Sequence, residues 1–190
     1  LDTVNRTLEL GHYYNLDSNS LFIIETAAWF SNLCYDRDPW NYQKKNSQYA
    51  EKFLQKIGVR QDLIKNITNC ILCTRLPQQP KNTMEEISCD AHMYHLGLED
   101  FEKQSKLIRK ELMLITRKKI SKDEWKQRDL ELLQNHRFKT EFAKQLLETQ
   151  QRKNLDLLTS KPIITSRISM GLTDQQNQLE NSKESPNYKA

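Results

Sequence analysis

The sequence predicts an all-α protein, a single helical bundle of seven or eight helices. Three observations support this fold class. Apolar residues recur at spacings of three and four along most of the chain, and no sustained strand-like alternation is present. Only four glycines and five prolines occur, whereas β-sandwiches and barrels need frequent turn residues. With 190 residues, the chain is long enough for one domain with a buried core.

Two helices are expected first, over about residues 2–14 and 20–34. The second is apolar nearly all round, as is typical of a helix at the centre of a bundle. Its aromatic pair, Trp29 and Phe30, is therefore expected to be buried. On that basis, replacing Trp29 with alanine should cost about 3 to 5 kcal/mol.

The next two helices are predicted from their apolar repeats. The third carries Tyr49, Phe53 and Ile57 and ends at Gly58, which suits a left-handed C-cap. The fourth spans about residues 61–74. Its core positions recur at helical spacing and are Leu63, Ile67, Cys70 and Ile71. Together these four helices are expected to form the core of the bundle.

The second half of the chain begins after a loop. Pro77 and Pro80 cannot continue a helix, so an exposed loop should precede a helix that starts near Met84. A further helix is expected over about residues 100–115. The next one starts at Ser121, which forms a capping box with Glu124, and helical structure continues to Leu158.

The domain organisation follows from these helices. Residues 1–158 should form the helical domain, and residues 159–190 a polar C-terminal tail. Between residues 173 and 190, only Leu179, Tyr188 and Ala190 are apolar. Such a segment cannot offset the entropy of ordering itself, so we expect it to be mobile or to lie on the surface.

Composition limits the cellular location and the kinds of partner that we expect. A net charge of +4, spread along the chain, suits a soluble protein and does not indicate a nucleic-acid partner. The most apolar stretch, residues 21–30, is much shorter than the roughly 20 residues of a membrane span. Cys70 and Cys73 lack a second pair at zinc-site spacing. We therefore expect reduced cysteines and a cytoplasmic location.

Several catalytic classes lack their minimal motifs. The chain contains no GxSxG, no glycine-rich phosphate loop and no HExxH. His92 and His95 lie three residues apart and would share a helix face, where they could contribute to a divalent-metal site or simply be satisfied helix histidines.

Five segments carry a resemblance to a known family. In chain order they are AAWFSNLCY, ITNCILCTRLPQQP, EEISCDAHMYHLG, IRKEL and SKDEWKQRDLELLQNHRFKT. Their order resembles the bacterial HD-domain metal-dependent phosphohydrolase family, and most of all the HD domains of Pycsar-type antiphage effectors. The resemblance covers about residues 12–158. It implies a helical bundle in which histidines and aspartates hold a divalent metal that activates water against a phosphoester.

The family's metal-binding residues are largely replaced in this chain. The two early histidine positions correspond to Tyr14 and Ser18, and the His-Asp doublet to Ser31 and Asn32. A further His-Glu pair falls near Gln43 and Lys44 on a loose alignment. The hydroxyls and amides at these positions are weak metal ligands.

The later acidic motif of the family is only partly retained. Where many relatives have Asp-Ala-Asp, this chain has Asp90, Ala91 and His92. The resemblance therefore leaves Asp90 and His92 as the candidate metal ligands, fewer than the three or so protein ligands of a catalytic site. We interpret the chain as a degenerate HD domain without a cofactor, in which a divalent metal is needed only if hydrolase activity persists.

The same resemblance indicates a ligand pocket. Arg109 and Arg137 match family positions near the cavity, and arginine binds phosphate through paired hydrogen bonds. An ion pair between Arg109 and Glu102 is the simpler alternative. The predicted lining of an anion pocket is Ser31, Asn32, Asp90, Arg109 and Arg137.

Three functions stay open at this point. The first is a ligand-binding or signalling module for a phosphorylated or cyclic nucleotide, with a homo-oligomer as a possible assembly. The second is a metal-dependent phosphohydrolase, and the third is a protein-interaction scaffold. Relatives of the antiphage type place this domain before a membrane-associated region, to which the residues after Leu158 correspond poorly.

Overall fold

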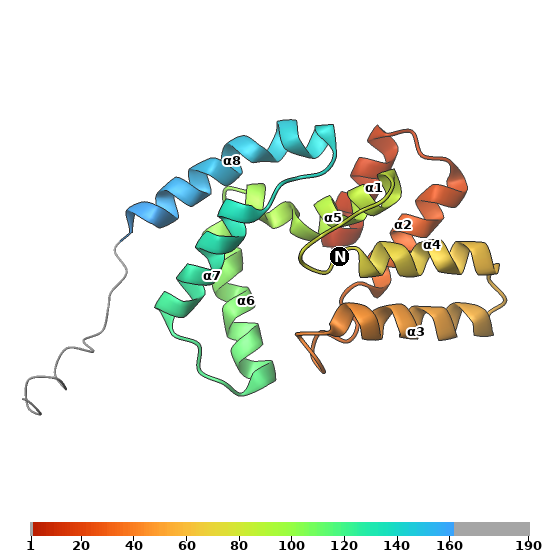
Figure 1. Cartoon of the computed structure of the whole chain (residues 1–190), viewed down its shortest axis with the longest axis horizontal. Coiled ribbons are helices and arrows are strands. Elements are labelled where there is room, and N and C mark those ends of the chain that lie inside the picture. Colours follow the sequence, from red (N-terminus) through yellow and green to blue (C-terminus); the bar gives the residue numbers. More distant parts are fainter. Residues whose placement is uncertain (1, 162–190) are drawn as a thin grey trace, which may run out of the picture. The chain divides into compact units, whose positions relative to one another are not determined.

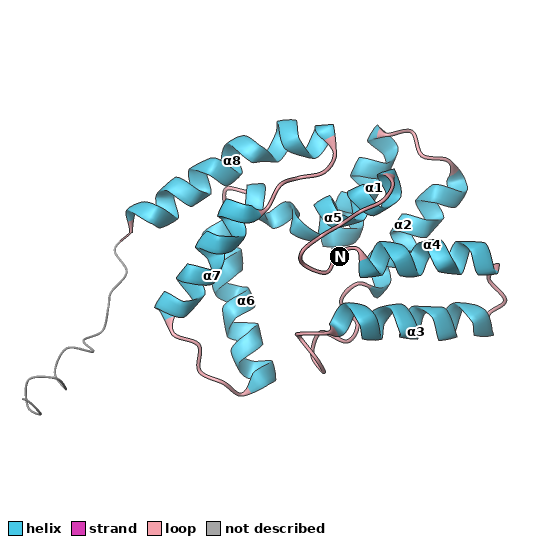
Figure 2. Cartoon of the chain, in the orientation of Figure 1, coloured by secondary structure: helices cyan, strands magenta, loops and turns pink. Residues whose placement is uncertain are grey.

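The computed structural model describes residues 2–161 of the chain. These residues form eight α-helices and one 3-10 helix, and no strand occurs among them (Figures 1 and 2). Of the residues that the structure describes, 73% are helical, which confirms the predicted all-α class. By its contacts, the chain divides into residues 1–160 and residues 161–190. The predicted mobile tail lies, from residue 162 onward, outside the described residues.

Residues 1–160 contain two apolar clusters. The first joins α1 (Asp2–Tyr13), α2 (Ser18–Phe30), α3 (Tyr42–Lys56), α4 (Gln61–Leu72) and α5 (Thr83–Met93). The second joins the end of α5 and η1 (Tyr94–Gly97) to α6 (Phe101–Thr116), α7 (Lys122–Asn135) and α8 (Glu141–Ser160). The sequence predicted one bundle core, whereas the structure has two, connected through α5 and η1.

Helix α2 packs against α1, α4 and α5, as expected for a central helix. Asp17, the residue before α2, caps the N-terminus of this helix: its side chain accepts a hydrogen bond from the Ser20 amide at 2.7 Å. Ile23, Ile24 and Ala27 are buried, but Trp29 is 53% exposed and Phe30 is only partly buried. The prediction that both aromatic residues are buried is wrong. Because α2 is apolar nearly all round, its sequence could not indicate which face points away from the core.

We therefore expect Trp29→Ala to cost much less stability than the sequence suggested. Trp29→Ala should lower the free energy of unfolding by less than about 1 kcal/mol, because half of the side chain already contacts solvent. Phe138→Ala, at a position only 1% exposed, should cost about 3 to 5 kcal/mol. Urea unfolding of both variants checks this contrast, and equal losses would contradict it.

Helix α3 buries a different face from the predicted one. Tyr49, Phe53 and Ile57 are 56%, 46% and 59% exposed, whereas Ala50 and Leu54 are buried. Helix α3 packs mainly against α4, and a small, fully buried side chain such as that of Ala50 suits close packing of helices. The helix does stop as predicted, since Gly58 has φ +79° and continues into the next segment through left-handed backbone.

A buried polar residue on α3 organises the segment after α2. The Asn46 amide oxygen accepts a hydrogen bond from the Cys34 amide at 2.8 Å. Its amide nitrogen donates to the Ser31 carbonyl at 2.6 Å. Asn46 is fully buried, and these bonds satisfy both ends of its side chain. The segment that follows α2 is thus held against the start of α3.

The C-terminal helices follow the sequence signals closely. The capping box between Ser121 and Glu124 is present at the start of α7. The basic loop residues Arg117, Lys118 and Lys119 are exposed.

All four cysteines are free; Cys70 and Cys89 are buried, and Cys34 and Cys73 are partly buried. Within residues 2–161, no helix combines the length and apolar character that crossing a membrane requires.

Candidate functional site

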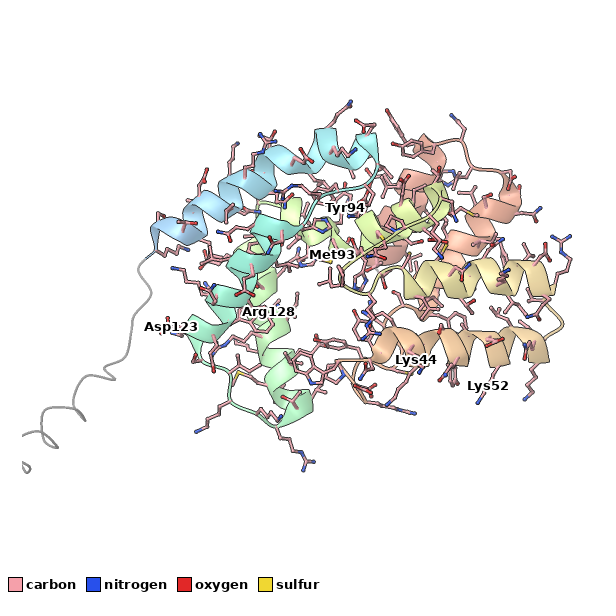
Figure 3. All side chains as sticks on the ribbon, viewed as in Figure 1. Lys44, Lys52, Met93, Tyr94, Asp123 and Arg128 are labelled. Atoms are coloured by element: carbon pink, nitrogen blue, oxygen red, sulfur yellow. The ribbon has the colours of Figure 1, made fainter. Side chains whose placement is uncertain are left out.

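A cavity of about 740 Å³ lies among elements from both apolar clusters. Its walls come from α1, the segment between α2 and α3, the start of α3, the loop after α4, the end of α5, η1, α6 and α7. Figure 3 labels two of the lining residues, Met93 at the end of α5 and Arg128 on α7. This volume is within the range of small-molecule sites, about 300 to 1,000 Å³.

Aromatic side chains supply much of the lining. They are Tyr35, Trp40, Tyr42, Phe101 and Trp125. Tyr35 and Tyr42 meet edge to face, with ring centroids 5.2 Å apart. Trp40 is 67% exposed, so its indole is accessible at the margin of the cavity. Such a wall suits a ligand with a planar ring.

Two neutral histidines line the same cavity. The Tyr42 hydroxyl and His92 Nε2 are hydrogen-bonded at 3.0 Å, and the His95 ring stacks on Phe101 with centroids 6.3 Å apart. Burial lowers the pKa of each imidazole to about 4. At neutral pH, both rings are therefore uncharged and can donate one hydrogen bond and accept another.

A polar network connects α6 and α7 at the cavity wall. The Ser105 hydroxyl donates to Asp129 Oδ2, and Trp125 Nε1 donates to Ser105 Oγ at 2.6 Å. The Arg128 guanidinium lies 4.2 Å from the centre of the Trp125 ring and 3.6 Å from Asp129 Oδ1. Burial raises the pKa of Asp129, while the Ser105 hydrogen bond acts in the opposite direction. Arg128 remains 49% exposed and thus accessible to a ligand.

One buried polar atom on the cavity wall is unsatisfied. The Gln43 side chain is 6% exposed, and its Oε1 has no hydrogen-bond partner among the described residues. Buried amide oxygens are nearly always hydrogen-bonded. Gln43 is thus a polar group that a ligand or solvent could satisfy.

The structure does not bring the predicted pocket residues together. Asn32 and His92 line the large cavity, whereas Ser31 lines a small one of about 10 Å³, which His92 also borders. Arg109 donates from Nε and Nη2 to the Ile120 carbonyl at 3.0 and 2.6 Å. Arg137 lines a separate cavity. None of these three cavities is lined by all five residues, and the binding roles of these residues stay predictions.

Asp90 forms hydrogen bonds that connect two helices of the protein. Its two oxygens accept hydrogen bonds from the amides of Lys139 and Thr140, both at 2.8 Å, and from the Thr140 hydroxyl at 2.7 Å. Asp90 is fully buried, and Thr140 precedes α8 directly. Burial raises the pKa of Asp90, and the donated hydrogen bonds oppose this shift. The carboxylate joins α5 to the beginning of α8.

The two candidate metal ligands are thus occupied by protein partners. Both Asp90 oxygens accept hydrogen bonds, and His92 Nε2 is bonded to Tyr42. In the described part of the chain, no group of three or more histidine, cysteine, aspartate or glutamate side chains could hold a metal ion. The residues at this position do not fit the ligand set that the family resemblance implies.

Sequence reasoning missed several lining residues. Trp125, Arg128, Asp129 and Leu132 lie at spacings of three, four and seven on α7, so one face of this helix lines the cavity. That spacing was a usable signal in the sequence. Tyr42 gave no such signal, and the sequence indicated Gln43 only as a replaced metal-binding position of the family. Both residues reach the cavity through the packing of α3.

Comparison with known proteins adds no relative. No protein-family model matches the chain, and neither a curated protein nor a solved structure is significantly similar to it.

Proposed function

We propose that this protein is a ligand-binding or signalling module of degenerate HD-domain type, and that its ligand is a nucleotide with few phosphate charges. The observation that supports this most is the cavity of about 740 Å³ with its aromatic and polar lining. A nucleotide combines a planar base, a hydroxyl-bearing sugar and an anionic group. The cavity offers a matching group for each of these parts.

The aromatic residues suit the base. Trp40 is exposed at the cavity margin, and Tyr35 is held edge to face against Tyr42. Stacking of a base on an aromatic side chain contributes about 1 to 3 kcal/mol. The unsatisfied oxygen of Gln43 favours a ligand with an N–H donor, such as the amino group of a base.

The charges of the lining limit the ligand's own charge. Two arginines, Arg75 and Arg128, are present together with three carboxylates, Asp36, Glu111 and Asp129. Arg128 can bind one phosphate through paired donors, while the carboxylates would accept hydrogen bonds from sugar hydroxyls and repel a polyphosphate. We therefore favour a cyclic nucleotide or a nucleoside monophosphate over a triphosphate.

A second candidate, protein interaction, has its own support. Exposed apolar side chains on α2, on α3 and directly after α3 are Trp29, Tyr49, Phe53 and Ile57. The ring centroids of Phe30 and Phe53 lie 5.8 Å apart. Exposed apolar surface of this kind is typical of protein contacts. A homo-oligomer formed through it is compatible with ligand binding. The module would act in the cytoplasm, where its free cysteines stay reduced.

Thermal-shift screening of nucleotides tests the proposal. A ligand that binds only the folded state adds about 2.7 kcal/mol of stability at about 100 times its dissociation constant. We expect a cyclic nucleotide or monophosphate to raise the melting temperature, and Arg128→Gln to reduce that rise.

Arg60→Gln is the matched control, because Arg60 is exposed and lies outside the cavity. If no nucleotide raises the melting temperature, or if both arginine variants respond as the wild type does, the nucleotide proposal fails. Protein interaction would then be the better supported function. A metal-dependent loss of nucleotide phosphate would instead favour the phosphohydrolase.

A further inference from the structure

A second cavity, of about 190 Å³, lies at the junction of α7 and α8. It shares no lining residue with the large cavity. Its walls include His136 and Arg137, which follow α7, and Glu148, Gln151 and Arg152 from α8. The volume is below the roughly 300 Å³ at which pockets begin to accept drug-sized molecules, so a small ion or a single chemical group suits it.

The charged lining of this cavity is mainly cationic. Arg137 and Arg152 contribute positive charge, and Glu148 is the one carboxylate in the lining. Arg152 is 78% exposed and lies 3.5 Å from Glu148 by Nη2 to Oε2, a long contact that leaves most of its donors accessible. Two cations against one anion favour a negatively charged ligand.

Arg137 is held in place by the end of α7. Its Nη1 donates to the carbonyls of Gln134 and His136 at 2.7 and 2.8 Å. The Gln151 amide also donates to the His136 carbonyl, at 3.1 Å. These bonds satisfy carbonyl oxygens that would otherwise repel an anion, and they fix a guanidinium that has further N–H donors.

A buried imidazole adds an independent indication of a ligand. His136 lines the cavity and is only 6% exposed, yet its Nε2 has no hydrogen-bond partner in the described part of the protein. Buried ring nitrogens usually have one. Burial, assisted by the charge of Lys139, lowers the pKa of His136 to about 4. The neutral ring therefore has one N–H, and in one tautomer Nε2 carries it.

We infer that this cavity is a binding site for a small phosphate-type oxyanion. Arg137 and Arg152 would contact its oxygens as charged donors, and His136 Nε2 would complete the set as a neutral donor. The ligand is either free inorganic phosphate or the terminal phosphate of a small molecule. This site is independent of the proposed nucleotide cavity.

Titration of the full chain with inorganic phosphate, at constant ionic strength, is the test. Two-dimensional NMR of the histidine side chains should show the His136 Nε2 resonance moving in a saturable way. Arg152→Gln should weaken phosphate affinity about tenfold, as expected for the loss of a charge-assisted hydrogen bond. The exposure of Arg152 makes this variant safe for folding.

Two comparisons assign the effect to this site. Arg60→Gln removes an exposed arginine elsewhere and should leave phosphate affinity unchanged. Arg128→Gln, in the large cavity, should also leave the His136 response intact. Equal binding of glycerol 2-phosphate would identify the terminal phosphate of a small molecule as a ligand, and binding of inorganic phosphate alone would identify the free ion. An unmoved His136 resonance, or full affinity in Arg152→Gln, would overturn the inference.

Discussion

Asp90→Ala should lower the free energy of unfolding by about 3 to 5 kcal/mol. The substitution removes the acceptor for two backbone amides, those of Lys139 and Thr140, and for the Thr140 hydroxyl. Asp90 is fully buried, so water cannot replace the carboxylate without a rearrangement. The loss should appear in urea unfolding as a lower midpoint with an unchanged slope.

Thr140→Val is the graded control for this prediction. It removes the hydroxyl that donates to Asp90 at 2.7 Å and that accepts a hydrogen bond from the Ala143 amide at 3.3 Å. The hydrogen bonds from the amides of Lys139 and Thr140 to Asp90 stay in place. We expect a loss of about 1 to 2 kcal/mol, as for one side-chain hydrogen bond and the capping contact at the start of α8. If Asp90→Ala costs no more than Thr140→Val, the carboxylate does not join α5 to α8 in the way the structure shows.

Acidification should destabilise the protein well above the pH at which ordinary carboxylates protonate. The pKa values of His92, His95 and His136 are lowered from 6.5 to about 4 in the folded protein. In the unfolded chain they regain ordinary values, so unfolding takes up protons once the pH falls below about 6.5. The stability that these groups contribute is present above pH 6.5 and is lost as the pH falls toward 4.

The size of this effect follows from linkage. Between pH 6.5 and pH 5, each histidine should remove about 1.5 kcal/mol of stability, and the three together about 4 to 5 kcal/mol. Asp90 and Asp129 act in the opposite direction, because their raised pKa values favour the folded state as they protonate. The histidine contribution is isolated by comparing urea unfolding of the wild type and His136→Gln.

His136→Gln should remove about a third of the pH dependence in this interval. Glutamine keeps a polar side chain of similar size but does not titrate. A variant whose stability falls with pH as steeply as that of the wild type would show that His136 is not buried as a neutral ring.

Capping residues allowed the end of α3 and the start of α7 to be predicted. Capping acts over one turn of backbone, so the local sequence is enough to predict it. Examples are Gly58 and the pair Ser121 and Glu124. The buried faces were harder to predict. On α3, the large side chains of Tyr49 and Phe53 gave the stronger apolar signal, but the buried positions are Ala50 and Leu54.

The candidate site was harder to predict from the sequence than the fold. Asp90 matched a family motif, yet its partners lie 49 and 50 residues further along the chain. Arg109 and Arg128 are both arginines on helices, and only the packing of α6 and α7 shows that Arg128 lines the cavity while Arg109 binds the Ile120 carbonyl. Such pairings depend on tertiary contacts that no local pattern specifies.

Isothermal titration calorimetry of Trp40→Ala and Trp29→Ala tests the central claim most directly. Both tryptophans are exposed, at 67% and 53%, but only Trp40 lines the large cavity. With the nucleotide that gives the largest thermal shift, the wild type and Trp29→Ala should bind with the same affinity. Trp40→Ala should bind the nucleotide at least about tenfold more weakly, because the variant lacks the indole on which the base stacks. Equal affinities for all three proteins, or no heat of binding from the wild type, would contradict a nucleotide site in this cavity.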